Sequence, residues 1–261
     1  MMKVRIRFTK TGSMQYIGHL DLMRFFQKLF RRCGFDVCYS QGFNPHQLMS
    51  FASPLGLGVT TVADYLDVSL ESYKVTSLAG DGYAGRTLDA KEWLDRINSF
   101  SNEMVTVTGI YRQPDNAKPS MSLLSAASYV IYGMEPAQAM SVEEFFYNEH
   151  EIKYEKKTKK SVKELDLKQG IYAVAAGYEK YCALAEELSV RDVAYERKTA
   201  YSADALYMLC KSGSDVNVRP DMLLACYGMK MEPEREYDRY KYEIVRTDMF
   251  YGDEKLISMS L

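Results

Sequence analysis

The chain has 261 residues, of which 47% are hydrophobic and 26% charged, and its formal net charge is −2. This composition is typical of a folded globular protein and excludes a disordered chain. Five cysteines at wide, irregular spacings, without a CxxC pair, argue against a disulfide scaffold, a zinc ribbon and a redox dithiol. The sequence has no signal-like N-terminus and no apolar run of 18 residues, so we expect a cytoplasmic protein with no membrane partner.

The chain begins with a strand and a helix. Residues 3–9 alternate between apolar and polar side chains, which is the period-two pattern of a half-buried strand. A helix is predicted over residues 19–33, because Gly18 suits its N-cap and Gly34 its end. Its buried face is formed by apolar residues at helical spacing, namely Leu22, Phe26, Leu29 and Cys33.

Further elements complete a first module over residues 1–112. We expect strands at 35–40, 48–52, 64–70 and 104–111, and a helix at 88–98. Taking the segment 48–52 as an extra hairpin arm, the order is β-α-β-β-α-β, the ferredoxin-like split arrangement.

A polar, proline-bounded connector follows, and the linker is placed at 113–125. A similar order of elements then recurs without sequence repetition, with strands expected at 126–132, 152–154, 162–167, 206–210 and 242–250 and helices at 142–147, 178–188 and 220–227. The sequence therefore predicts an α+β protein of two ferredoxin-like modules in tandem, with antiparallel sheets. The second module spans 126–261 and carries an insertion near 170–203.

Several segments of the first half carry a family resemblance: IRFTKTG (6–12), GHLDLMRFFQKLFRR (18–32), YSQGFNPH (39–46), SFASPLGLGV (50–59) and DYLDVSL (64–70). The second half adds KKTKKSVKELDL (156–167), SGSDVNVRPDMLL (212–224) and VRTDMFY (245–251). In this order they resemble the radical-SAM-associated, or radical-SAM-linked, proteins of bacteria. Two departures are Gly18, where a serine is usual, and Gln47, where a second proline is common.

The resemblance implies partner molecules, but it does not imply a settled biochemical activity. Its expected partner is a radical-SAM protein, with RNA as a second partner, because family members commonly have genomic neighbours connected with ribosomes and RNA processing. The chain itself has no cluster of three close cysteines that would hold an iron–sulfur cluster, so it is not the radical enzyme. It also lacks a phosphate-binding glycine loop, and we expect no cofactor and no metal.

Basic residues are concentrated near the N-terminus, where residues 1–50 hold eight Lys and Arg against Asp21 and Asp36. Phosphate attraction requires such clustering. The alternative is an ordinary solvated surface with acids nearby. The candidate nucleic-acid-binding residues are Lys3, Arg5 and Arg7 on an expected open sheet face, Arg24, Lys28, Arg31 and Arg32 on the helix, and Lys156, Lys157, Lys159 and Lys160 in a basic loop. Candidate base-stacking partners are Tyr16, Tyr39 and Phe43.

Three residues are catalytic candidates, His19, Asp21 and His46. The two imidazoles would transfer protons, with Asp21 or Asp67 orienting one of them, or His19, Asp21 and His46 would bind a metal. The alternative is structural: His19 occupies the first turn of a helix, and His46 hydrogen-bonds the Gly42–Pro45 loop.

The leading hypothesis is a non-catalytic accessory protein that binds RNA or a ribonucleoprotein and acts with a radical-SAM enzyme. A first alternative is a module that docks to the radical-SAM partner without nucleic acid. A second is a metal-independent endoribonuclease that uses His19, by analogy with the paired ferredoxin-like enzymes that process CRISPR repeats.

Overall fold

The computed structural model describes residues 1–76, 80, 82–157, 162–188, 190, 205–213, 215–252 and 255–260. It is a mixed α+β protein with mostly antiparallel sheet and six α-helices among these residues, which confirms the predicted class. The chain divides into two compact units, residues 1–123 (with Ser260) and 124–259. Within the part of the chain that is described, no helix has the length and apolarity needed to cross a membrane.

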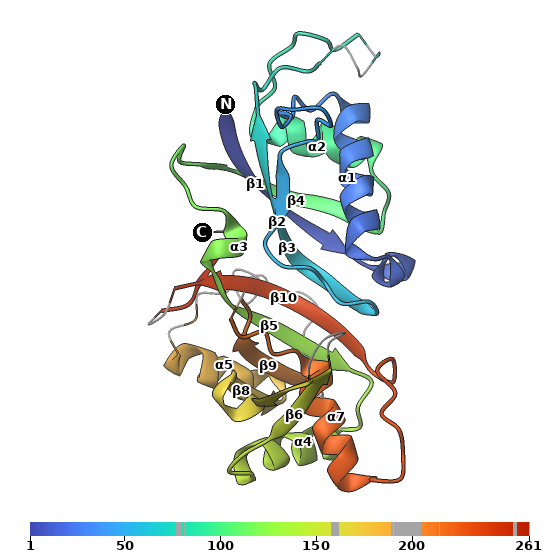
Figure 1. The fold of residues 1–261 in the computed structure, drawn as a ribbon, viewed down its shortest axis with the longest axis vertical. Coiled ribbons are helices and arrows are strands. Elements are labelled where there is room, and N and C mark those ends of the chain that lie inside the picture. The colour runs from blue at the N-terminus through green and yellow to red at the C-terminus, as the bar shows by residue number, and fades with distance from the viewer. Residues whose placement is uncertain are drawn as a thin grey trace. The chain divides into compact units, whose positions relative to one another are not determined.

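The described residues of the first unit form four strands and three α-helices (Figure 1). In chain order they are β1 (Met2–Lys10), α1 (His19–Cys33), β2 (Met49–Phe51), β3 (Val59–Leu70), α2 (Ala90–Phe100), β4 (Val105–Gln113) and α3 (Ser120–Leu123), with the short 3-10 helix η1 (Gly12–Tyr16) after β1. The strands lie in the order β4-β1-β3-β2, and every neighbouring pair is antiparallel. Helices α1 and α2 cover one face of this sheet.

The core of the first unit lies between the sheet and these two helices. Val4, Ile6 and Phe8 of β1 are fully buried there, as the predicted apolar face requires. The strand is not half-buried, however, because Arg5 and Arg7 on its other face are buried as well. The ring of Phe8 packs edge-on against Phe26 of α1, with 4.8 Å between ring centroids. Trp93 of α2 fills the same core.

Helix α1 begins and ends at the predicted residues. Gly18 is its N-cap, and Gly34 adopts the left-handed conformation with φ of 73°. The N–H of Phe35 donates to the Phe30 carbonyl at 2.9 Å, which closes the last turn as in a Schellman motif. Glycine is favoured at this position because a side chain would be strained there.

The predicted strand at residues 35–40 is wrong. The segment makes isolated bridges only, from Val37 to Leu70 and from Tyr39 to Gln47. The Val37 N–H turns back to the Phe35 carbonyl at 2.9 Å, so the backbone bends just after α1 and cannot form a continuous ladder.

The second unit has a sheet of four main strands in the order β10-β5-β9-β8, with the short strand β11 (Ile257–Ser258) beside β10. The main strands are β5 (Leu124–Tyr132), β8 (Ile171–Ala176), β9 (Leu206–Lys211) and β10 (Glu243–Tyr251), and their neighbouring pairs are antiparallel. The helices are α4 (Pro136–Asn148), α5 (Tyr178–Glu187) and α7 (Pro220–Met231). Strands β6 (Lys153–Lys157) and β7 (Val162–Asp166) form a separate hairpin, followed by the 3-10 helix η3 (Leu167–Gln169).

Two features of the second unit differ from expectation. Strand β8 was not predicted, and it occupies part of the region assigned to an insertion near 170–203, of which residues 189 and 191–204 lie outside the described part. Helix α4 begins at Pro136, before the expected start at 142, because proline is well suited to a first helical turn.

Truncating Phe26 to alanine should destabilise the first unit by about 3–5 kcal/mol, because it empties the centre of this aromatic core. Trp93, the single tryptophan of the chain, is buried in the same core, so its fluorescence during urea unfolding reports on this unit. The matched control is Phe43→Ala, since Phe43 is fully exposed, and it should change the free energy of unfolding by less than about 0.5 kcal/mol. Equal effects of the two substitutions would contradict the described core.

Candidate functional site

Four basic side chains on α1, here called the α1 stripe, are all exposed: Arg24, Lys28, Arg31 and Arg32. Arg24 pairs with Asp21 at 3.1 Å, and both side chains are more than half exposed. The Arg32 guanidinium donates to the Phe100 carbonyl at 2.7 Å. Lys28 and Arg31 have no ion pair or hydrogen bond with any described residue, so their charges are available to an outside anion.

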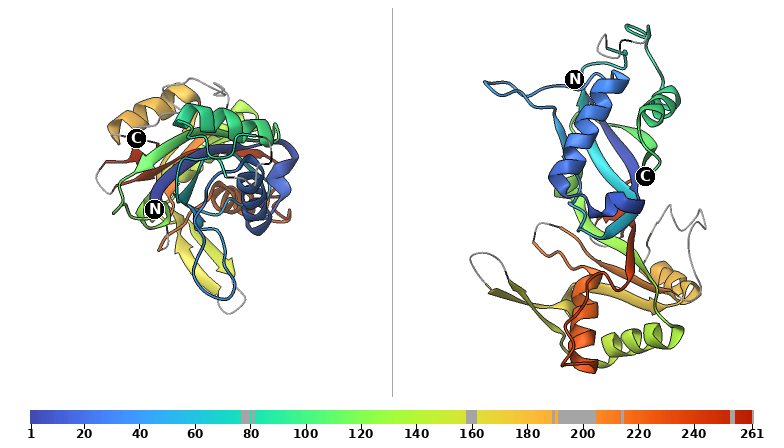
Figure 2. Two further views of the ribbon diagram at one scale, coloured as in Figure 1. Left: turned by 90° about the horizontal axis from the view of Figure 1, so that it is seen from above. Right: turned by 90° about the vertical axis from the view of Figure 1, so that its right-hand side faces the viewer.

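The three predicted stacking residues are exposed as well. Tyr16 lies at the end of η1, and Tyr39 begins a loop that a bridge to Gln47 closes. This loop projects from the rest of the first unit (Figure 2). Phe43 lies within it, with no part of its ring covered. An uncovered phenylalanine in a projecting loop is suited to contact a partner surface.

Lys3, Arg5 and Arg7 were predicted to lie on an open face of the sheet, and this prediction is wrong for Arg5 and Arg7. Arg5 and Arg7 are only 4% and 3% exposed. The connector after β4 lies over part of this face, where the Lys3 ammonium donates to the Ala117 carbonyl at 3.0 Å. Nucleic-acid binding by these three residues stays a prediction.

The basic hairpin β6–β7 carries charges of both signs. The Lys153 ammonium lies 3.4 Å from the Glu151 carboxylate and 3.3 Å from the Glu164 carboxylate. Lys156 is half-buried. Lys159, Lys160 and the side chain of Lys157 lie outside the described residues. Among the described side chains of the hairpin, three lysines (Lys153, Lys156 and Lys163) stand against three acids (Glu155, Glu164 and Asp166), so they carry no net positive charge.

His19 and His46 make separate contacts. The His19 ring packs edge-on against Phe51, with 5.1 Å between ring centroids. The His46 Nδ1 lies 2.8 Å from the Ser40 hydroxyl, which also accepts a hydrogen bond from the His46 backbone N–H. Asp21 is paired with Arg24, and Asp67 with Arg5. His46 bonds to Ser40 and not to the expected loop 42–45. None of these contacts among the described residues joins the two imidazoles to each other or to Asp21 or Asp67.

The described cysteines and acids do not form a metal site, since no group of three potential ligands comes together among the residues that the structure places. All five thiols are free. Burial raises the pKa of Cys33 and Cys226 to about 11. Burial, followed by the nearby Glu71 carboxylate, raises the pKa of Cys38 to about 11. At neutral pH these side chains are inert thiols.

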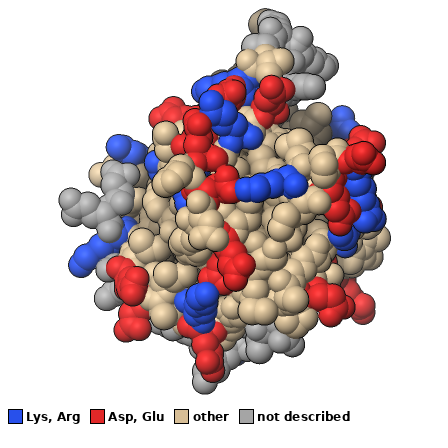
Figure 3. Space-filling model, turned by 90° about the horizontal axis from the view of Figure 1, so that it is seen from below, with Lys and Arg blue, Asp and Glu red and all other residues tan. Residues whose placement is uncertain are grey.

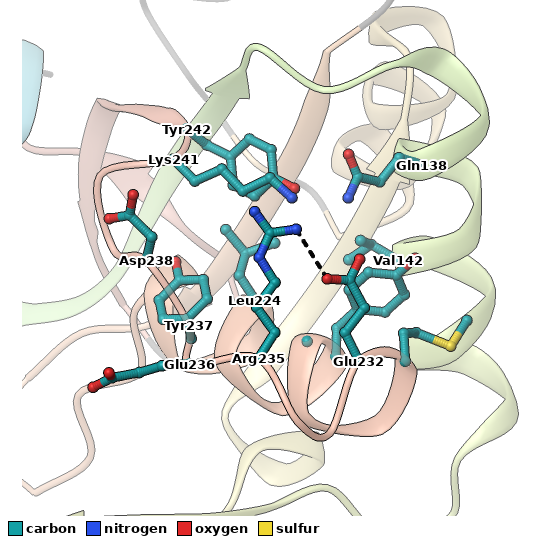
Figure 4. Close-up of a pocket in the computed structure, with 13 residues that line it drawn as sticks. Gln138, Val142, Leu224, Glu232, Arg235, Glu236, Tyr237, Asp238, Lys241 and Tyr242 are labelled. Carbon is teal, nitrogen blue, oxygen red and sulfur yellow. Dashed lines mark hydrogen bonds and ion pairs between the residues drawn. The ribbon is translucent and has the colours of Figure 1, made fainter.

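A pocket of about 120 Å³ lies in the second unit between α4, α7 and the segment after α7 (Figure 4). Arg235 lies in its middle and pairs with Glu232 at 3.1 Å. Burial first, and then the Asp221 carboxylate, raise the pKa of the Tyr237 phenol, so it is neutral at physiological pH. This pocket could not be predicted from the sequence, because residues 232–242 are mostly polar and have no regular period.

The charges around the helices of the second unit are mixed. In the view from below (Figure 3), acidic and basic side chains alternate across the surface with uncharged residues between them. Such a surface does not attract phosphate strongly, because neighbouring charges of opposite sign cancel.

These features define a two-unit α+β protein with an exposed basic helix in its first unit. Residues 3–220 match the model of a family described as an uncharacterized protein conserved in bacteria (DUF2344). The chain belongs to this bacterial family. A comparison with curated proteins finds no match.

Alkylation of the folded protein at pH 8 should modify Cys182 at most, because it is the half-exposed thiol and the other four are buried. Raising the pH toward 11 should increase the reactivity of the buried thiols, since their raised pKa values keep them protonated below that range. Mass spectrometry of iodoacetamide-treated protein measures the adducts, with Cys182→Ser as the control. Rapid modification of Cys33 or Cys226 at pH 8 would contradict the described burial.

Proposed function

We propose that the protein is a non-catalytic accessory protein that binds RNA or a ribonucleoprotein through the α1 stripe and acts with a radical-SAM enzyme. The observation that carries the RNA part is the stripe itself, with four exposed cations on one helix against the single acid Asp21. Nucleic-acid backbones are bound mainly through such clusters of Lys and Arg. The radical-SAM partner is proposed from the sequence resemblance alone.

Exposed aromatic rings near the ends of α1 support the same proposal. Proteins bind single-stranded RNA by stacking unpaired bases on aromatic side chains beside a basic groove. Tyr16 precedes α1 and Tyr39 follows it, and both rings are exposed. They lie on the same unit as the basic stripe and would add base contacts to the phosphate contacts.

We also propose that each unit is a ferredoxin-like module. The support is that β4-β1-β3-β2 and β10-β5-β9-β8 follow one scheme, in which the fourth, first, third and second strands of a β-α-β-β-α-β unit lie side by side. In the second unit the hairpin β6–β7 and helix α5 would then be additions to this scheme. Many RNA-binding modules have a four-stranded sheet with two helices, which is an analogy of fold only.

A second candidate function is docking to the radical-SAM partner without nucleic acid. Phe43, uncovered in its projecting loop, favours it, because exposed aromatic anchors often dominate protein interfaces. This function predicts that a nuclease-treated preparation retains an iron–sulfur protein and that Phe43→Ser loses it. Loss of the same protein on nuclease treatment of the parent would argue against direct docking.

Reversing the charge of the stripe should weaken RNA binding. The variant Arg24→Glu/Lys28→Glu/Arg31→Glu should bind a fluorescein-labelled single-stranded RNA at least tenfold more weakly than the parent, measured by anisotropy. The parent should lose affinity between about 50 and 200 mM salt, and the slope should become shallower in the variant by roughly 0.7 per lost phosphate contact.

The matched control is Lys74→Glu/Lys91→Glu/Arg112→Glu, which changes the net charge equally at exposed positions of the same unit. It should weaken binding less than the stripe variant does. An equal loss of RNA affinity in both variants would mean that net charge, and not the stripe, determines binding. Absent or salt-insensitive RNA binding by the parent would refute the RNA proposal.

A further inference from the structure

A second pocket lies in the first unit, on the sheet face turned away from α1 and α2. Its volume is about 290 Å³. Its floor is formed by side chains of three strands, Lys3 and Arg5 of β1, Ser50 of β2, and Asp67 and Ser69 of β3. These residues share a face because Arg5 lies opposite Asp67, and Lys3 opposite Ser69, in the antiparallel register.

The connector after β4 forms the wall of this pocket. Ala117, Lys118 and Pro119 line it, and the Ala117 carbonyl accepts a hydrogen bond from Lys3. The backbone N–H of Ser120, at the start of α3, donates to the Asp67 Oδ2 at 2.5 Å. These bonds hold the connector against the sheet and give the pocket a fixed shape.

The charge of the pocket is positive. Lys3, Arg5 and Lys118 line it, and Asp67 is the single acid among the lining residues. The Arg5 Nε is already paired with Asp67 at 2.8 Å. Its Nη2 is buried and has no hydrogen-bond partner in the described structure. A guanidinium cannot lose its charge by deprotonation at physiological pH, so an unsatisfied donor of this kind favours an anionic partner.

Arg7 adds to this positive field. It lies two residues along β1 on the same face, is 3% exposed, and its Nε and Nη1 have no partner among the described residues. Two buried guanidinium groups so close together make the region unfavourable for another cation and favourable for an anion.

The rest of the lining is apolar. Leu48, Ala117 and Pro119 contribute hydrocarbon surface to the pocket. Ligand pockets typically combine such a surface with a few polar groups that fix the orientation of the ligand. A ligand that satisfies both parts has an anionic head and an apolar body.

We infer that this pocket, between the β1–β3 face and the connector 113–119, binds a small amphipathic anion. The head group lies toward Lys3, Arg5 and Lys118, and the apolar body lies against Leu48, Ala117 and Pro119. With three cations against one acid, the lining attracts carboxylate and phosphate head groups alike. The inference does not depend on the proposed RNA binding, because it concerns the opposite side of the sheet from α1.

The test is an NMR titration of the full-length protein with hexanoate, hexyl phosphate and 1-hexanol as probes. Hexanoate should shift the backbone amide signals of Ser50, Ser69 and Ala117 with saturation in the millimolar range. Hexyl phosphate should bind at least as tightly as hexanoate, because the net positive lining attracts a dianion more strongly, and 1-hexanol should bind at least tenfold more weakly. Binding of 1-hexanol as tight as that of hexanoate, or the absence of a saturable shift with either anion, would overturn the inference.

Variants locate the site. Arg5→Met/Asp67→Asn removes both partners of the buried ion pair together, so that neither charge is left alone, and should weaken hexanoate binding at least tenfold. Lys118 is exposed, so Lys118→Gln should not disturb folding, and it should weaken hexanoate binding about threefold. The control Lys91→Gln, at an exposed position of α2, should leave hexanoate binding unchanged. Equal affinities of Lys118→Gln and Lys91→Gln would overturn the inference.

The RNA-binding variant separates the two proposals. Charge reversal of the α1 stripe should leave hexanoate binding unchanged, because the stripe and the pocket lie on different faces of the unit. If the protein binds hexanoate but not RNA, the anion pocket is supported and the proposed function is refuted. If it binds RNA but not hexanoate, the proposed function is supported and the pocket inference is refuted.

Discussion

The packing of α1 on the sheet of the first unit determines which residues face solvent. Phe26 contacts Phe8 of β1 at 4.8 Å and Phe51 of β2 at 5.9 Å between ring centroids, so one face of α1 is fixed against the core. Because an α-helix has 3.6 residues per turn, Arg24, Lys28 and Arg31 must then lie away from that face. The exposed stripe is thus a consequence of the same packing that stabilises the unit.

The alternation of β1 acts in the same way on the other side of the sheet. Because Ile6 and Phe8 point toward the helices, Arg5 and Arg7 point to the opposite face, where they are buried. A charged guanidinium is costly to bury without partners, and Asp67 compensates Arg5 only in part. Two basic groups of residues in one unit therefore have different surroundings, an exposed stripe suited to a polyanion and a half-open pocket suited to a small anion.

Local sequence predicted the elements whose signals are local. The limits of α1 follow from Gly18 and Gly34, and the faces of β1 follow from period two. Strand β8 could not be recognised, because four of its six residues are buried and an apolar run has no strand period. The burial of Arg5 was also beyond prediction, since the connector that covers this face comes more than a hundred residues later in the chain, as the Lys3–Ala117 bond shows. The surroundings of His19 depend likewise on a tertiary contact, with Phe51, whereas His46 bonds locally to Ser40.

The central claim is that the α1 stripe binds RNA, and the most direct measurement is the nucleic-acid content of the protein purified from cells at low salt. The ratio of nucleic-acid to protein absorbance would be high, sequencing would find an enriched RNA, and the RNA would be released as the salt concentration rises. The stripe variant purified in parallel would be free of nucleic acid. A parent protein that purifies free of nucleic acid at low salt would contradict the account and leave the stripe as solvated surface.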